Sequence, residues 1–169
     1  MNDPAPDAVL ALEGEYGDWS NFGRRPVTVF GREWPTSEHP FQAAKFFGVL
    51  GGPGRVGKIA AVESPSAAKH LGSSRVIPIR ADWDWVSFGV MTLVVARKFE
   101  QHPDLRDQLV SSDHALIVEG NGHGDDLWGA VWIPEQMTLG KVWAREHGRM
   151  LVGRNLLGKA LMLVRSDLR

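Results

Sequence analysis

Residues 82–101, DWDWVSFGVMTLVVARKFEQ, carry the clearest structural signal of the chain. Asp82 is a good N-cap residue, and the apolar residues Val90, Leu93 and Val94 that follow recur at helical spacing. A second apolar set has the same spacing: Met91, Val95 and Phe99. We therefore predict a long helix from Trp83 to about Gln101, with shorter elements on both sides of it.

These shorter elements are mixed. A hairpin is predicted over 27–34 with its turn at Gly31-Arg32, and Thr36 and Ser37 can cap a helix over about 38–50. The remaining predictions are a loop over 51–57, short helices over 58–62, 65–71 and 104–110, strands over 76–79, 115–118 and 127–133, a loop over 119–126, and mostly helix from Thr138. Helices and strands do not alternate regularly enough for a doubly wound sheet. We therefore expect an α+β fold, compact and helix-rich, with a few short strands.

Length and composition limit the class of protein. The 169 residues suit one domain, which we place at 8–169 after a disordered lead-in over 1–7. The formal net charge of −1 gives no overall field that attracts nucleic acid or membranes. The absence of cysteine excludes disulfides, thiolate metal sites and a cysteine nucleophile. No apolar stretch reaches the ~18 residues of a membrane span, and no secretory leader is visible, so we expect a cytoplasmic protein.

Two motifs suggest common cofactor sites but lack essential parts. Residues 52–57, GPGRVG, satisfy G-x-G-x-x-G, but the segment before them is predicted as helix and no acidic residue follows at the required distance. Ile59 stands after Lys58 where a P-loop needs Ser or Thr. The six histidines form no pair with zinc spacing. We therefore expect neither a bound cofactor nor a metal.

The first candidate catalytic group lies on the helix that begins near Glu38. Glu38, Gln42 and Lys45 have the spacing i, i+4, i+7, which places a carboxylate, an amide and an amine on one helix face. Such a face is commonly only solvated, but Phe41 and Phe46 make this helix strongly apolar and favour a partly buried setting. A carboxylate and an amine in such a setting change each other's proton affinity, as acid–base and Schiff-base chemistry require.

Two further segments resemble parts of a pocket. The glycine-rich loop over 119–129 offers Asp125 as a carboxylate and Trp128 as a stacking surface. The tetrapeptide Trp19-Ser20-Asn21-Phe22 flanks a polar pair with aromatic rings. Each segment also fits ordinary turn chemistry, and the seven tryptophans of the chain fit a Trp-rich core as well as ligand stacking. Taken together, the segments indicate a pocket for a flat, hydroxylated molecule.

Five motifs of the chain resemble, in the same order, signatures of the NADAR (YbiA-like) superfamily. They are WSNF at 19–22, PTSEHPFQAAKF at 35–46, RADWD at 80–84 with VM at 90–91 and ARKF at 96–99, DDLWG at 125–129, and NLLGKALMLVR at 155–165. The match spans residues 19–165, and residues 133–150 resemble an expansion between the last two motifs. No one motif is decisive, but five in register are specific.

The resemblance implies the α+β fold and an N-glycosidase that cleaves the bond between ribose C1′ and a nitrogen. The implied substrates are phosphoribosylamino-pyrimidine intermediates of riboflavin synthesis or ADP-ribose attached to guanine, which would make ADP-ribosylated nucleic acid a partner. By motif position, Glu38, Lys45 and Asp125 are implied as catalytic. Motif position, together with the helix-face and pocket arguments above, gives the expected substrate-binding residues. They are Trp19, Asn21, Phe22, Gln42, Trp83, Trp128, Gly129 and Asn155.

Several alternatives remain at this point. Lys45 could attack C1′ of the opened sugar to form a Schiff base, or it could pair with phosphate or with Glu38. The same residues could serve a non-catalytic module that binds ADP-ribose or NAD. A third alternative is a nucleic-acid partner of the basic segment 141–169, although the solvated face of an amphipathic terminal helix is the favoured explanation of that charge.

Overall fold

The computed structural model describes residues 9–12, 14–120, 124–134, 142–146 and 149–169. The chain divides into two compact units. We call residues 18–103 the helical unit, and residues 1–17 together with 104–169 the C-terminal unit. The lead-in predicted over 1–7 lies outside the described residues. No helix in the described part of the chain has the length and apolar character that a membrane span needs.

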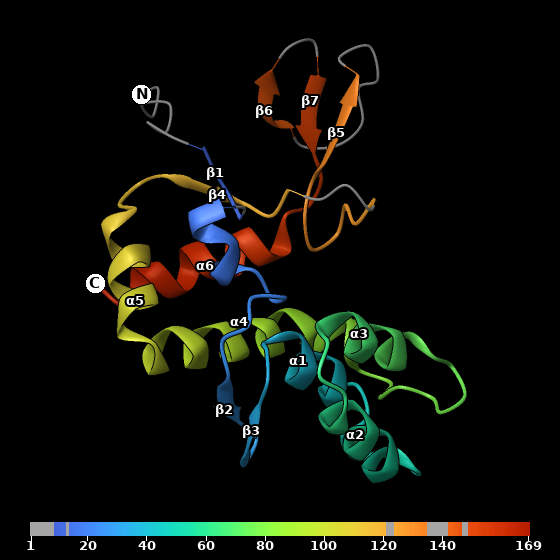
Figure 1. Cartoon of the computed structure of the whole chain (residues 1–169). Helices are drawn as coiled ribbons and strands as arrows, with labels where there is room; N and C mark the ends of the chain where they lie inside the picture. The colour runs from blue at the N-terminus through green and yellow to red at the C-terminus, as the bar shows by residue number, and fades with distance from the viewer. Residues whose placement is uncertain (1–8, 13, 121–123, 135–141, 147–148) are drawn as a thin grey trace. The chain divides into compact units, whose positions relative to one another are not determined.

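The helical unit contains four helices and one hairpin (Figure 1). These are β2 (Val27–Val29), β3 (Arg32–Trp34), α1 (Glu38–Ala44), α2 (Gly52–Ala61), α3 (Pro65–Ser73) and α4 (Trp83–Gln101). Helix α4 confirms the long helix predicted from the apolar spacing. Its Met91, Val94 and Phe99 are almost fully buried, as the spacing requires.

The hairpin and the start of α3 follow from local chemistry. In β2, Val27 and Val29 are buried while Thr28 between them is exposed, which is the alternation of a half-buried strand. Phe30 and Gly31 both have positive φ in the turn, as the favoured two-residue hairpin turns require. The Ser64 side chain accepts a hydrogen bond from the backbone N–H of Ala67 and caps α3.

The predicted loop over 51–57 is wrong, because α2 begins at Gly52. Helix α1 is also shorter than predicted and ends at Ala44. Gly51 adopts a left-handed conformation between the two helices, and a proline in the first turn of α2 suits a helix start. The glycines that suggested a phosphate-binding loop therefore lie within a helix.

The C-terminal unit combines strands with two helices. Its elements are β1 (Val9–Ala11), η1 (the 3-10 turn Gly14–Trp19, which runs into the helical unit), α5 (Pro103–Ser111), β4 (Leu116–Val118), β5 (Val131–Pro134), β6 (Val142–Glu146), β7 (Arg149–Val152) and α6 (Leu156–Asp167). Strands β1 and β4 pair in parallel, while β7 lies between β5 and β6 in an antiparallel sheet (Figure 1).

Three expectations differ from this architecture. The helix predicted from Thr138 is wrong over β6 and β7, where Trp143 and Leu151 pack into a small apolar core of the sheet. The strand predicted over 76–79 is wrong, since that segment contacts the core of the helical unit as irregular chain. The strand predicted over 127–133 begins only at Val131. The mixed, helix-rich α+β class itself is confirmed.

Candidate active site

Glu38 is a buried carboxyl group at the first position of α1. Its side chain is 5% exposed, and its Oε1 accepts a hydrogen bond of 2.7 Å from Nε2 of Gln42. Its backbone N–H donates to the carbonyl of Asn21 at 3.1 Å. Burial raises the pKa of Glu38, an effect opposed by the Gln42 hydrogen bond and by the charges of Lys69 and Lys45. The group is therefore prepared to hold a proton at higher pH than an ordinary glutamate.

Lys45 follows the last residue of α1, and its amine lies beside two aromatic rings that pack on each other. Nζ lies 5.8 Å from the ring centre of Phe41 and 5.7 Å from that of Trp83. Its hydrogen bond to the carbonyl of Gly72 is long, at 3.5 Å. Burial lowers the pKa of Lys45 to about 8, although Glu38 acts in the opposite direction. About a tenth of this amine is then unprotonated at pH 7, a large fraction for a lysine.

Asn21 connects the WSNF segment to Glu38. The fully buried Lys98 donates a 2.9 Å hydrogen bond to the carbonyl of Ser20 and so holds this segment against α4. The Asn21 amide donates to the sulfur of Met91 at 3.1 Å. A further hydrogen bond from the Asn21 side chain favours the charged form of Glu38 and lowers the pKa of that carboxyl.

Several polar oxygens near Glu38 are buried without a partner. Among the residues that the structure describes, no hydrogen bond reaches Asn21 Oδ1, Gln42 Oε1 or Ser37 Oγ. Buried polar atoms are nearly always satisfied in proteins, and exceptions concentrate at functional sites. His39 shows the usual situation, because its Nδ1 contacts the Thr36 hydroxyl and its Nε2 the Val62 carbonyl.

The other aromatic residues predicted in this unit differ in exposure. Trp19 is fully buried and meets Phe99 edge-on, with ring centres 6.0 Å apart. Phe22 is 40% exposed and lies 5.9 Å from the Lys69 ammonium. Trp83 is almost buried and packs on Phe41. Of the three, Phe22 offers the most open surface to a ligand.

The remaining predicted residues lie in the C-terminal unit. The Asp125 carboxylate accepts a hydrogen bond from the backbone N–H of Trp128 at 3.0 Å. The carbonyls of Trp128 and Gly129 accept hydrogen bonds from the backbone at the start of α6, the latter from the N–H of Asn155. Trp128 and Gly129 therefore cover the N-terminus of α6, while Asp125 fixes the turn that carries them.

Asn155 is fully buried, and its side chain forms hydrogen bonds with the backbone of β4 and of the residue that follows β4. Oδ1 accepts from the N–H of Glu119 at 3.0 Å, and Nδ2 donates to the carbonyl of Ile117 at 2.8 Å. Its φ of 50° is left-handed, a conformation that asparagine tolerates better than most residues. These hydrogen bonds give Asn155 a structural role.

The structure thus groups the predicted residues in two sets. The helical unit brings together Glu38, Gln42, Lys45, Asn21 and Trp83, and the C-terminal unit brings together Asp125, Trp128, Gly129 and Asn155. Within the described residues, no three His, Asp or Glu side chains gather in a way that could hold a metal ion.

The sequence analysis missed three contributors to the site. Phe41 was placed only in the apolar stripe, although its position four residues before Lys45 put it within reach of the amine. Lys98 lies on the same buried face of α4 as Met91 and Val94, a charge at an apolar position that could have been noticed. Gly72 gives no signal in the sequence, because its contacts depend on how α3 packs on α1.

Comparison with known proteins gives consistent results. A model of the NADAR domain family matches residues 12–169. The chain is 38% identical over 154 residues to N-glycosidase YbiA of Escherichia coli (strain K12), covering 91% of this chain and 82% of that protein. It is 31% identical to the chloroplastic riboflavin biosynthesis protein PYRR of Zea mays, covering 90% of this chain and 23% of that protein. The NMR structure of E. coli YbiA matches with a TM-score of 0.74 at 35% identity, over 97% of this chain and 86% of that one.

Proposed function

Because this chain belongs to the NADAR domain family, we propose that it hydrolyses the bond between ribose C1′ and a nitrogen of a nucleobase-like group. Its class is that of a hydrolase acting on N-glycosyl bonds, as in the relatives named N-glycosidase. The observation that carries the proposal is the pairing of the buried Glu38 with the half-buried Lys45, whose pKa values move toward neutrality from opposite sides. Such opposed shifts are typical of groups that exchange protons with a substrate.

Glu38 is the proton donor in this proposal. Cleavage of an N-glycosidic bond leaves an electron pair on the nitrogen, and the departure is easier when an acid protonates that nitrogen. Its raised pKa lets Glu38 keep a proton for this step, and Gln42 fixes the carboxyl through the 2.7 Å hydrogen bond.

Lys45 is the nucleophile. Ring opening breaks the C1′–O4′ bond, moves the N–H proton of the glycosyl nitrogen to O4′ and makes C1′ the carbon of an imine. The Lys45 amine adds to C1′ while the imine nitrogen takes the Glu38 proton, and the added amine returns a proton to the Glu38 carboxylate. The leaving nitrogen takes that proton as the C1′–N bond breaks, and transfer of the last Nζ proton to Glu38 leaves a Schiff base between Nζ and C1′. Water hydrolyses this Schiff base, releases the sugar aldehyde and restores the lysine. The rings of Phe41 and Trp83 keep Nζ partly desolvated and so maintain its reactivity.

Two substrate types fit this chemistry. Phosphoribosylamino-pyrimidines of riboflavin synthesis are supported by the likeness to a relative named for riboflavin biosynthesis. ADP-ribose attached to guanine, including guanine of nucleic acid, presents the same ribose C1′–nitrogen bond.

The other predicted residues take supporting roles in the proposal. In the C-terminal unit, Asp125 binds ribose hydroxyls or the charge that develops at C1′, and Trp128 offers a stacking surface. In the helical unit, the exposed Phe22 is the candidate contact to a base-like group, and the buried Trp19 packs against Phe99. Asn155 is a positioning residue in this proposal, because its side chain forms hydrogen bonds with the backbone of Ile117 in β4 and of Glu119. A cytoplasmic location stays a prediction.

A turnover assay tests the proposal. The protein would be incubated with ADP-ribosyl-guanosine and with 5-amino-6-(phosphoribosylamino)uracil, and the released base-side product followed by mass. We expect release from one of the two, lost in Glu38→Gln and Lys45→Ala and kept in Glu33→Gln, a matched control on the exposed face of β3.

Release from neither substrate, with calorimetric binding of ADP-ribose intact and unaffected by Glu38→Gln, would contradict the proposal. It would instead identify the chain as a non-catalytic module that binds ADP-ribose.

A further inference from the structure

Gly72 lies in the last turn of α3 at a point where this helix touches α1. A Cβ atom at this position would overlap the Gln42 side chain, 2.7 Å from Cδ and 2.8 Å from Cβ, and closer still to Oε1. The backbone of Gly72 does not have a left-handed φ, so the conformational freedom of glycine is not what the position requires. What it requires is the absence of a side chain, although glycine weakens a helix relative to alanine.

Gly72 contacts Lys45 of the candidate catalytic pair and the hydrogen-bond partner of Glu38. Its Cα faces the Gln42 amide, and this amide donates the 2.7 Å hydrogen bond to Oε1 of Glu38. Its carbonyl oxygen accepts the hydrogen bond from Nζ of Lys45. One backbone position of α3 therefore confines the partner of the acid and contacts the amine directly.

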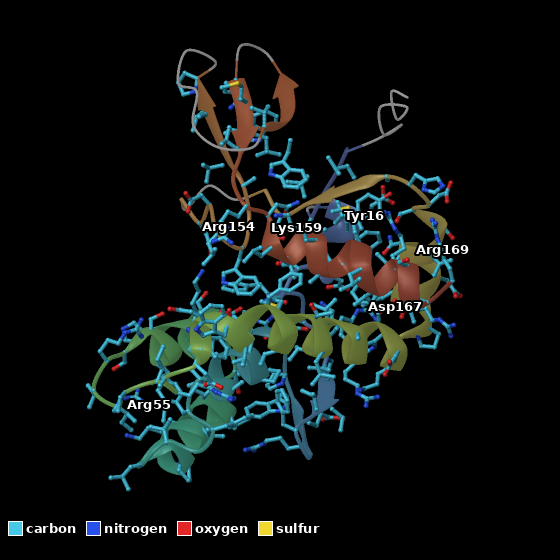
Figure 2. The ribbon with its side chains drawn as sticks, turned by 180° about the vertical axis from the view of Figure 1, so that it is seen from behind. Tyr16, Arg55, Arg154, Lys159, Asp167 and Arg169 are labelled. Carbon is cyan, nitrogen blue, oxygen red and sulfur yellow. The ribbon has the colours of Figure 1, made fainter. Side chains whose placement is uncertain are left out.

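The end of α3 is also fixed from its other side. Arg55 of α2 is buried, and Figure 2 labels its side chain in the region of α2 and α3. Its guanidinium donates to the carbonyl of Leu71 at 3.4 Å and to the hydroxyl of Ser74 at 3.5 Å. These contacts bracket Gly72 in the sequence. A methyl group at position 72 would therefore push the Gln42 amide aside and also press on Gln42 Cβ, which is fixed to α1.

We infer that Gly72 is a positioning residue, which holds Gln42 against Glu38 and offers its carbonyl to Lys45 through the close approach of α3 to α1. Its effect on catalysis rests on the proposed function, whereas its effect on the two side chains can be measured without substrate. The positioning role of Gly72 and the proposed function can therefore each fail without the other.

The test is Gly72→Ala in the full chain, with NMR titration of the Glu38 carboxyl carbon and the Lys45 Cε in the absence of substrate. The matched controls are Gly57→Ala in α2 and Gly89→Ala in α4, exposed helical glycines with open space where the methyl would go. We expect Gly72→Ala to raise the pKa of Glu38, because the carboxylate loses its amide donor. Both controls should titrate like the wild type.

Activity provides the second measurement. We expect kcat/KM to fall about 10- to 100-fold in Gly72→Ala and to stay within about twofold in both controls. If the titrations change as expected but the wild type releases no product from either substrate, the proposed function fails while the positioning contact stands.

Gln42→Gly completes the design, because it removes the donor to Glu38 and all the Gln42 atoms that the methyl would meet, Cβ included. We expect Gly72→Ala to have no further effect on the Glu38 titration in the Gln42→Gly background, because both changes act through the same side chain. The double variant also relieves the overlap and so remains usable if Gly72→Ala alone fails to fold. A Glu38 titration unchanged by Gly72→Ala, or changed equally with and without Gln42, would overturn the inference.

Discussion

The two units of the chain both bury asparagine side chains, but with opposite outcomes. In the C-terminal unit, the Asn155 amide pairs both of its polar atoms with backbone groups at Ile117 and Glu119. In the helical unit, Asn21 is also buried, yet its Oδ1 has no partner among the described residues. Burial of a polar group alone therefore does not indicate a functional site. Our proposal for the helical unit rests on the shifted ionisable groups beside Asn21.

The buried charges of the two units differ in the same way. Arg165 of α6 donates to the hydroxyl of Ser112 and to the carbonyl of Ala115, at 2.8 and 2.9 Å. Lys45 of the helical unit has two aromatic rings and one distant carbonyl. An arginine stays charged in any setting, whereas a lysine so poorly supported gives up its proton near neutral pH. We therefore expect Arg165 to contribute to stability and Lys45 to act in the proposed reaction.

The largest effect should come from Glu38→Gln. The amide keeps the volume of the side chain but cannot donate an acidic proton, so we expect kcat/KM to fall about 1,000-fold. The melting temperature should not fall, because the variant removes an ionisable group from a buried site. Product release by mass and thermal unfolding measure the two, with Glu33→Gln as control. A Glu38→Gln enzyme with a tenth or more of wild-type activity would contradict the assignment.

Lys45→Met should separate activity from stability. The thioether side chain can pack beside Phe41 and Trp83 as the lysine chain does, but it cannot form a Schiff base, so we expect a loss of about 100-fold or more in turnover. Each pKa unit corresponds to about 1.4 kcal/mol, and we expect the variant to raise the free energy of unfolding by about 1–3 kcal/mol at pH 7. Urea unfolding measures this gain.

The gain should depend on pH with a defined sign. The pKa of Lys45 is about 8 in the fold against 10.5 as the ordinary value, so between these pH values the unfolded chain binds more protons than the folded chain. Wild-type stability then rises with pH relative to the variant. The advantage of Lys45→Met should be complete below pH 8 and shrink toward pH 10.5. A constant difference across this range would show that the lysine is not desolvated.

Asn155→Ala should show the structural side of the comparison. It leaves the Glu119 N–H and the Ile117 carbonyl without their partner, and we expect a loss of about 2–3 kcal/mol in the free energy of unfolding. Activity per folded molecule should stay within about threefold of the wild type. Ser166→Ala, an exposed change on α6, is the control. Loss of turnover with unchanged stability would instead place Asn155 in contact with substrate.

The smallest effect is expected for Asp125→Asn. The amide oxygen can still accept the hydrogen bond from the Trp128 N–H, so the turn is kept while the negative charge is lost. We expect kcat/KM to fall about 10-fold, which corresponds to about 1.4 kcal/mol of transition-state stabilisation. The neighbouring Asp126→Asn serves as control. Equal activity of both variants and the wild type would remove Asp125 from the catalytic set.

Local signals in the sequence predicted part of the fold. The apolar spacing of α4 and the cap at Ser64 predicted helices because their causes lie within one segment. Asp82 precedes α4 as predicted, but its carboxylate pairs with Arg80 and makes no cap hydrogen bond. The GPGRVG segment was predicted as a loop from its glycines, but the left-handed Gly51 and the following proline start a helix there. Strands β6 and β7 were missed because pairing and the shared core with Trp143 stabilise them more than local propensity does.

The candidate site shows the same limit. Helical spacing predicted that Glu38, Gln42 and Lys45 share a face, and the Glu38–Gln42 hydrogen bond confirms that these two meet. Spacing rules could not predict that the carbonyl of Gly72 lies against Lys45, because residues 27 positions apart in different helices have no fixed spatial relation. Tertiary contacts from Gly72 of α3 and from Trp83 and Lys98 of α4 complete the candidate site, and helical spacing within α1 could not predict them.

Reductive trapping tests the central claim most directly, namely that the Lys45 amine attacks ribose C1′. The wild type would be treated with borohydride during turnover of whichever substrate it cleaves, and its peptides analysed by mass. We predict a reduced sugar adduct on Lys45 that is absent without substrate and absent in Lys45→Met. Full turnover with no adduct on Lys45 would contradict the covalent step and leave the lysine as a charge partner of Glu38 or of the substrate phosphate.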